Sequence, residues 1–162
     1  HHILFYQYIT YIYYANYILT DQGDWWLNLL AALLDKRAEP LSFVTRGVLE
    51  RAESFTQAVQ MLSSATDLIA PAYFIVGGVQ PDEGVIITRS QRKAVDTWRL
   101  NSSTSVADVW YVVETNYDHW VPPPPDDDRV TPACRAMNQT TRARINFATM
   151  LDVLVIEPVC NE

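Results

Sequence analysis

Polar residues that could do chemistry are concentrated in the stretch Tyr111–Arg129, which reads YVVETNYDHWVPPPPDDDR. Its first residues are typical of a strand, and a run of polar side chains, Thr115–Asp118, follows directly. Polar groups at the end of a buried strand are a common way to build a site on a rigid scaffold. Three carboxylates, Asp126–Asp128, and the cation of Arg129 come after four prolines that favour an extended backbone. A surface turn with a solvated acidic loop would have the same composition, so both interpretations stay open.

Among the histidines, His119 is the candidate for a catalytic base, because the other two are His1 and His2. Beside Trp120 its imidazole could equally be packed or hydrogen-bonded, and we favour this structural interpretation. The sequence contains no P-loop, no G-x-G-x-x-G, no G-x-S-x-G and no Cys or His pair at zinc spacing. We therefore expect no cofactor and no metal.

The composition is that of a globular chain. Of the 162 residues, 49% are hydrophobic and 19% are charged, which suits one domain with a sizeable core. The net charge of −7 argues against a nucleic-acid partner, which would require a basic patch. A sequence pI near 4.8 means that the chain would tolerate an acidic compartment.

Residues 1–24 differ in composition from residues 25–162, and we divide the chain there. Residues 1–20 carry no Asp, Glu, Lys or Arg and are dense in Tyr and Ile. A membrane helix needs about 20 mainly apolar residues, but the Tyr, Gln, Thr and Asn content favours a strand here. Translated non-coding sequence is a third interpretation. Because the chain begins with His1 and shows no signal peptide, we interpret it as a fragment or a processed product.

Three helices are predicted before the sheet. The first covers residues 25–34, Pro40 opens the second, and Ser54 caps the third. Each has one apolar stripe, so the helices form a layer that must pack on a sheet. The stripe residues of the second and third helices are Leu41, Val44, Val48, Leu49, Phe55, Val59 and Leu62.

Four strands follow, and their short connections favour an antiparallel meander. Near-continuous apolar runs in the first two strands predict burial on both faces, with a layer above and another below. Two more helices are expected at residues 131–137 and 147–154, the second capped by Asn146. The predicted strands are residues 72–76, 84–88, 94–100 and 109–114.

Four further residues bear on the compartment. Cys134 and Cys160 could pair or remain free, and two cysteines cannot fix the redox environment. Asn101 and Asn138 both begin the glycosylation acceptor pattern, which favours a secretory route.

Several spaced motifs together resemble the β-subunit of acid ceramidase and of its relative, N-acylethanolamine-hydrolysing acid amidase. The motifs are APAYFIVGG at 70–78, EGVIITR at 83–89, TNYDHW at 115–120, DDR at 127–129 and NQT at 138–140. They occur in order, and the likeness covers roughly residues 25–159. TNYDHW and Trp25-Trp26 resemble the acid amidase more, whereas APAYF resembles the ceramidase, so the choice between the two stays open.

The resemblance implies an α+β chain that forms part of a four-layer αββα N-terminal-nucleophile hydrolase. In that family a precursor cleaves itself, and the cysteine exposed at the start of the β-subunit attacks the amide carbonyl. Asn116 matches the family's active-site Asn, which stabilises or positions the oxyanion. Arg129 matches an Arg that orders the nucleophile and nearby carboxylates.

The sequence also departs from the family pattern. The nucleophilic cysteine, with the Arg and Asp that follow it, would precede Trp25, and residues 1–24 do not contain them. Neither cysteine of the chain stands at the nucleophile position. Asp21 at best replaces the family's active-site Glu, and Val130 stands where the family has a second Arg. The family's final strands are missing after residue 159.

Two functions are therefore expected as alternatives. The first is a lysosomal-type lipid amidase that hydrolyses N-acylethanolamines or ceramides. It would reach the lysosome through the secretory pathway, and its nucleophile is absent from this chain. Its partners would be an N-acyl lipid, an α-subunit from the same precursor and the surface of lipid membranes. The second is a non-catalytic paralogue or lipid-binding scaffold of the same fold. An acyl pocket could be lined by aromatic residues, although such residues more often form ordinary core: Trp25, Trp26, Phe74 and Trp120.

Overall fold

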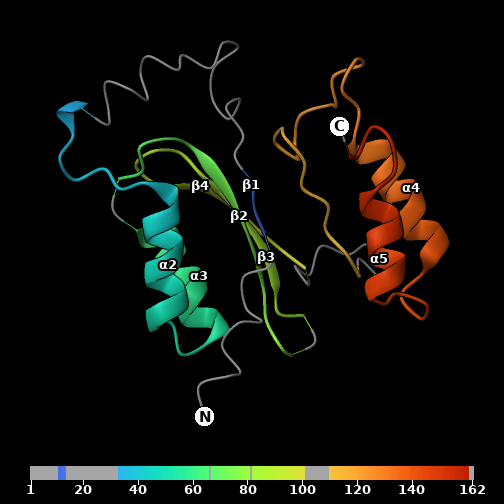
Figure 1. Ribbon diagram of the computed structural model, residues 1–162, viewed down its shortest axis with the longest axis horizontal. Coiled ribbons are helices and arrows are strands. Elements are labelled where there is room, and N and C mark those ends of the chain that lie inside the picture. The colour runs from blue at the N-terminus through green and yellow to red at the C-terminus, as the bar shows by residue number, and fades with distance from the viewer. Residues whose placement is uncertain (1–10, 14–32, 66, 81, 101–109, 161–162) are drawn as a thin grey trace.

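A four-stranded antiparallel sheet forms the centre of the molecule (Figure 1). The computed structural model describes residues 11–13, 33–65, 67–80, 82–100 and 110–160. The strands lie in the order β1-β2-β3-β4, and each pairs with the next in sequence. Their bounds are β1 Tyr11–Tyr13, β2 Ala72–Gly77, β3 Gly84–Arg89 and β4 Ala94–Arg99. Three of the predicted strands and their antiparallel meander are thus confirmed.

The two central strands are buried on both faces, as their apolar runs predict. Phe74 pairs with Ile87 across β2 and β3, and both side chains are fully buried in the main core. Tyr73 and Ile86 belong to a second cluster on the opposite face. On β4 the burial alternates between half-buried and exposed residues, which is typical of a strand with one covered face.

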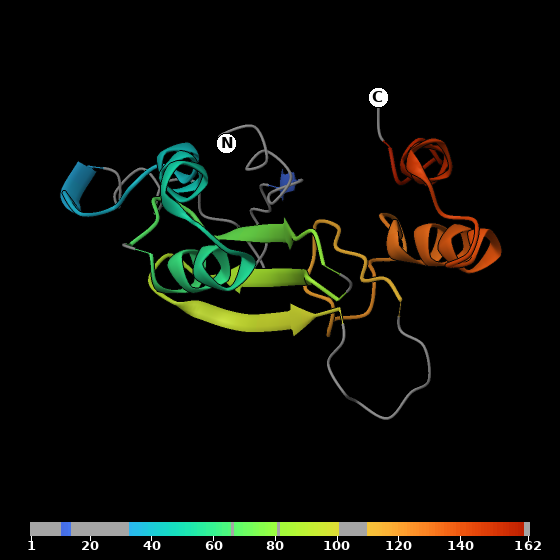
Figure 2. The ribbon, with the colours of Figure 1, turned by 90° about the horizontal axis from the view of Figure 1, so that it is seen from below.

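Two helices cover one face of the sheet, α2 (Leu41–Arg51) and α3 (Phe55–Ser64), as Figure 2 shows from below. The predicted cap is confirmed, because the Ser54 hydroxyl accepts a hydrogen bond from the backbone of Gln57 at 3.2 Å. A capping oxygen of this kind satisfies one of the free N–H groups of the first turn. The helical residues buried against the sheet are Val44, Val48, Phe55, Ala58, Val59 and Leu62.

The predicted strand at residues 109–114 is wrong for the described residues 110–114, which are extended but belong to no strand. Its apolar side chains divide between two clusters instead of forming one ladder face. Val112 packs on the cluster of Tyr73 and Ile86, whereas Trp110 and Val113 pack on the cluster of the last two helices. Side-chain packing on both sides thus holds this segment in place. The β-propensity of its residues alone predicts a strand of the sheet.

The last two helices form a pair beyond this extended segment, α4 (Val130–Thr140) and α5 (Phe147–Leu154), seen in orange and red in Figure 1. Both were predicted, and Asn146 caps α5 with a reciprocal capping box with Thr149. Their shared core consists of Ala133, Met137 and Val153.

Other sequence expectations have mixed outcomes. Most of the first predicted helix and the acceptor site at Asn101 lie outside the described residues. Cys134 and Cys160 are both free. Within the described ranges, no helix is long and apolar enough to cross a membrane.

Candidate active site

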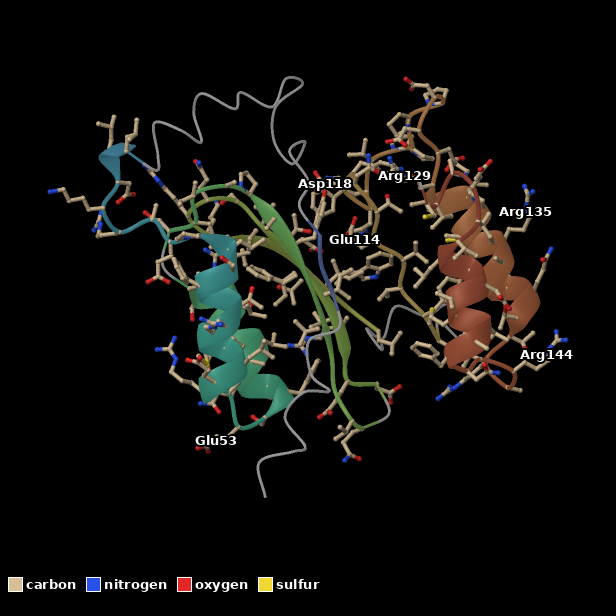
Figure 3. The ribbon with its side chains drawn as sticks, in the orientation of Figure 1. Glu53, Glu114, Asp118, Arg129, Arg135 and Arg144 are labelled. Carbon is tan, nitrogen blue, oxygen red and sulfur yellow. The ribbon has the colours of Figure 1, made fainter. Side chains whose placement is uncertain are left out.

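The segment 110–118, which bends at Asn116 and Tyr117, carries polar side chains along the sheet face opposite α2 and α3. In Figure 3 the labelled residues Glu114, Asp118 and Arg129 lie together between β2 and α4. Its apolar residues, such as Val112, are fixed by packing, so the polar residues that follow are held from a rigid base. The segment therefore positions a site although it is not a strand.

Asn116 and Arg129 are brought together by Asp127, which contacts both. The Asn116 amide nitrogen donates to Asp127 Oδ2 at 2.5 Å, and Arg129 Nε donates to Asp127 Oδ1 at 2.7 Å. Nearby, the backbone N–H of Val130 donates to the hydroxyl of Tyr117 at 3.2 Å. These contacts close the proline-rich loop at its base, so the two residues singled out from the sequence share one hydrogen-bonded group.

Asp127 was not singled out by sequence reasoning, although it is the centre of this group. Hydrogen bonds from Asn116 and Arg129 hold the pKa of its carboxyl below the usual range. The carboxylate therefore stays ionised in acid. The available signal was the spacing Asp-x-Arg at the end of the loop, but which of the three aspartates faces Asn116 depends on how four prolines fold.

Glu114 lies next to this group, and the pKa of its carboxyl shifts in the opposite direction to that of Asp127. Burial raises the pKa of its carboxyl to about 8, against the lowering effect of a hydrogen bond from the backbone of Thr115 at 2.9 Å. Three consecutive residues here have a buried oxygen without a hydrogen-bond partner among the described residues: Glu114 Oε2, Thr115 Oγ1 and Asn116 Oδ1. Such oxygens are uncommon in folded proteins, and together they mark a polar spot that the described chain leaves incomplete.

Asp118 fixes the far end of the segment to the sheet. Its Oδ1 accepts a hydrogen bond of 2.7 Å from the hydroxyl of Tyr73, a fully buried residue of β2. Burial raises the pKa of Asp118, while the hydrogen bond from Tyr73 and the nearby His119 oppose this effect. The pKa of Tyr73 is raised mainly by burial and then by this contact.

His119 is placed as a packed imidazole rather than a base beside Asn116. Its ring stacks on Trp98 with centroids 4.2 Å apart and meets Trp120 edge-on at 4.8 Å. Its Nε2 lies 3.1 Å from Asp96 Oδ2 on β4. The favoured structural interpretation of this histidine agrees with these contacts.

Of the two cysteines, one lies on α4 and the other follows α5. Cys134 lies on α4, and burial raises the pKa of its thiol, which disfavours the reactive thiolate. The Tyr111 hydroxyl has one hydrogen, which it shares between Asn138 Oδ1 at 2.9 Å and the backbone carbonyl of Cys134 at 3.3 Å. Cys160 is exposed.

The two described aromatic residues of the candidate acyl pocket lie in different places, and the favoured interpretation as ordinary core is confirmed for Phe74 but wrong for Trp120. Phe74 is fully buried in the core against α2 and α3, whereas Trp120 is 47% exposed beside His119. Trp25 and Trp26 lie outside the described residues.

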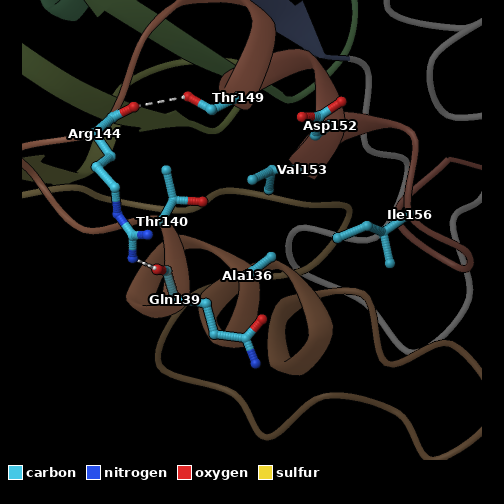
Figure 4. Close-up of a pocket in the computed structure, with 8 residues that line it drawn as sticks. All are labelled: Ala136, Gln139, Thr140, Arg144, Thr149, Asp152, Val153 and Ile156. Carbon is cyan, nitrogen blue, oxygen red and sulfur yellow. Dashed lines mark hydrogen bonds between the residues drawn. The ribbon is translucent and has the colours of Figure 1, made fainter.

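A separate pocket of roughly 280 Å³ lies between α4 and α5 (Figure 4). Arg144 closes one side by donating to the backbone carbonyl of Gln139 at 2.8 Å. The pocket's lining residues are Ala136, Gln139, Thr140, Arg144, Thr149, Asp152, Val153 and Ile156.

The described residues contain no group of three His, Cys, Asp or Glu that could hold a metal ion.

Comparison with known proteins agrees with the resemblance. The chain is 48% identical over 141 residues to N-acylethanolamine-hydrolyzing acid amidase of Oryctolagus cuniculus, covering 87% of the chain and 38% of that protein. It is 44% identical over 138 residues to acid ceramidase of Heterocephalus glaber, covering 85% of the chain and 34% of that protein. The chain thus spans less than two fifths of these relatives. No protein-family model matches it.

A solved structure extends the likeness to the fold. The Caenorhabditis elegans N-acylethanolamine-hydrolyzing acid amidase ortholog matches with a TM-score of 0.63 and 35% sequence identity, over 75% of this chain and 49% of that one. The expected fold class is therefore confirmed. The chain is an α+β portion of the N-terminal-nucleophile hydrolase fold, with an antiparallel sheet and flanking helices.

Proposed function

We propose that this chain forms part of a lipid amidase that hydrolyses the amide bond of N-acylethanolamines or ceramides to a free fatty acid and an amine. The observation that carries the proposal is the group of Asn116, Asp127 and Arg129 within a sequence similar to acid amidases and acid ceramidases. N-acylethanolamine is the first substrate to test, because the identity is 48% to the Oryctolagus cuniculus acid amidase and 44% to the Heterocephalus glaber acid ceramidase.

In the proposed mechanism, Asn116 donates a hydrogen bond to the oxyanion that forms when the amide carbonyl is attacked. Oriented neutral donors of this kind stabilise the developing charge most in the transition state. Arg129 supplies a permanent positive charge that orders the anionic groups around it. By analogy with the family, the nucleophile is an N-terminal cysteine that neither Cys134 nor Cys160 replaces, since both are internal residues without a free α-amine.

By analogy with the acid amidases and acid ceramidases that the chain resembles, we propose a lysosomal location reached through the secretory pathway. At acid pH the Asp127 carboxyl remains ionised because its pKa is lowered, while Glu114 remains neutral because its pKa is raised. The acceptor site at Asn138 is exposed on α4, where a glycan could be attached. The proposed partners are an N-acyl lipid, an α-subunit of the same precursor and a membrane surface.

A second candidate is a non-catalytic, lipid-binding scaffold. It is favoured by the two cysteines, since both are internal residues and burial raises the thiol pKa of Cys134. The scaffold and the enzyme share the fold, so only turnover distinguishes them.

Expression of the complete coding sequence tests the proposal. The purified protein is incubated with N-acylethanolamine and with ceramide at about pH 5 and about pH 7.5, and fatty acid release is measured. We expect faster release at acid pH, and unchanged release in the Cys134→Ser and Cys160→Ser controls. Lipid binding without fatty acid release under any of these conditions would favour the scaffold.

A further inference from the structure

The carboxylate of Asp127 holds the two proposed site residues with one oxygen each. Oδ2 accepts from the Asn116 amide and Oδ1 accepts from Nε of Arg129, at 2.5 Å and 2.7 Å. The other two aspartates of the triple-aspartate run, Asp126 and Asp128, differ from Asp127 in their surroundings. Asp128 accepts from the backbone N–H of Thr131 at the start of α4, and Asp126 is exposed.

An ionised carboxylate decides which end of the Asn116 amide faces it. A carboxylate can only accept hydrogen bonds, so the NH₂ end of the amide must point toward Asp127 and the oxygen must point away. Arg129 provides the balancing charge, and its side chain is 17% exposed, so the pair is partly shielded from water. An amide nitrogen carries two hydrogens, so one is held by Asp127 and the other remains for a second acceptor.

We propose that Asp127 is a positioning residue that fixes the Asn116 amide with its nitrogen presented to the substrate oxyanion. This role rests on the proposed amidase function. The amide oxygen supports this positioning role, because Asn116 Oδ1 is buried without a hydrogen-bond partner among the described residues. With its oxygen held by no described group, the amide depends on Asp127 for its orientation.

The substitution Asp127→Asn would invert this arrangement at nearly constant shape. The new side-chain oxygen would accept from the Arg129 cation, because charge-assisted hydrogen bonds are the stronger ones. Its NH₂ group would then face Asn116, which would turn its own oxygen toward it. The Asn116 oxygen would then take the place of the Asn116 NH₂ donor beside the oxyanion, and its partial negative charge would repel the oxyanion.

The substitution Asp127→Glu makes the opposite change. The side chain becomes longer by one methylene, but it remains an ionised acceptor for both Asn116 and Arg129. A role in orientation therefore predicts that Glu preserves more turnover than Asn at this position. A role in packing alone predicts the reverse, because Asn is the isosteric replacement.

The test measures kcat and KM for N-acylethanolamine hydrolysis with the full-length protein and four variants: D127N, D127E, N116A and D127N/N116A. We expect kcat of D127N to fall by about 10- to 100-fold with little change in KM, since misplacement of a catalytic group is costly for turnover. D127E should lose less. The double variant should lose no more than N116A alone, because Asp127 acts through Asn116. D126N serves as the matched control and should keep wild-type turnover.

Other outcomes would overturn the role. D127N within about twofold of wild type, D127N more active than D127E, or a multiplicative loss in the double variant would each do so. Thermal melts identify a variant that fails to fold, and the comparison then rests on the other substitution against wild type. A wild-type protein without turnover would instead overturn the proposed function, before any variant is compared.

Discussion

The hydroxyl of Tyr73 donates a hydrogen bond of 2.7 Å to Oδ1 of Asp118, and this contact ties the buried face of β2 to the segment that carries Asn116. The two residues are 45 positions apart in the chain. Tyr73 is fully buried and belongs to the same cluster as Ile86. The candidate site is thus anchored to a buried part of the sheet at one end and to α4 at the other.

Tyr73→Phe should therefore destabilise the protein and loosen the site. The change removes the donor and leaves the Asp118 carboxyl without it, and a hydrogen bond to a charged group contributes about 1.5–3 kcal/mol. We expect the free energy of unfolding, measured in urea, to fall by an amount near the lower end of this range, because Asp118 is only half-buried. Tyr111→Phe is the matched control, since its hydroxyl bonds Asn138 near the surface of α4. An equal effect in both variants would contradict the anchoring role of Tyr73.

Asn116→Ala should lower turnover of N-acylethanolamine by about 10²–10³-fold if its amide donates to the oxyanion. KM should change little, because the lost interaction forms mainly in the transition state. Steady-state kinetics at acid pH measure both values. Gln139→Ala, which removes an exposed amide on α4, is the control. Unchanged turnover of Asn116→Ala would remove Asn116 from the site.

Glu114 predicts a dependence of stability on pH. Its folded-state pKa of about 8, against an ordinary 4.5, means that the folded chain holds this proton where the unfolded chain has lost it. The stability due to the neutral carboxyl is therefore fully present below about pH 4.5 and is lost as the pH rises toward 8. Unfolding experiments across this window should show the decline in wild type and a smaller decline in Glu114→Gln.

The control for this experiment is Glu50→Gln on the exposed surface of α2. It should follow the wild-type pH dependence. Parallel curves for wild type and Glu114→Gln would contradict the buried, neutral state of Glu114.

Local signals were enough to predict most of the regular elements. Ser54 and Asn146 cap their helices by contacts within three residues, so their roles can be derived from neighbouring sequence alone. The runs that form β2 and β3 are apolar on both faces, which again is a property of the strand itself. Such elements are predictable because the deciding interactions are local.

The candidate site was predictable only in part. Resemblance to a known family indicates Asn116 and Arg129, and the geometry links them through Asp127. Asp127 itself was missed because its position depends on the path of the proline-rich loop. The segment containing Val112 was assigned to the sheet because its residues favour strands, yet its packing between two clusters is a tertiary effect.

Arg89 should prove essential for joining α3 to the sheet. Its side chain is fully buried at the end of β3 and donates to the carbonyls of Leu62, Ser63 and Ala65, at 2.7, 3.2 and 3.3 Å. These carbonyls lie at the C-terminus of α3, where the helix itself leaves acceptors unsatisfied. Burial lowers the pKa of the Arg89 guanidinium, but an arginine remains charged and so must keep such acceptors.

Arg89→Met keeps much of the side-chain volume but removes every donor. We expect the free energy of unfolding to fall by about 3 kcal/mol or more, because several buried carbonyls lose their partners at once. Arg89→Lys should recover part of the loss, since one ammonium can reach some of these carbonyls but cannot reproduce the planar fork. Arg99→Met on the exposed side of β4 is the control and should change the stability by no more than about 0.5 kcal/mol. If Arg89→Met were as stable as this control, the end of α3 would have to be held by its apolar contacts alone.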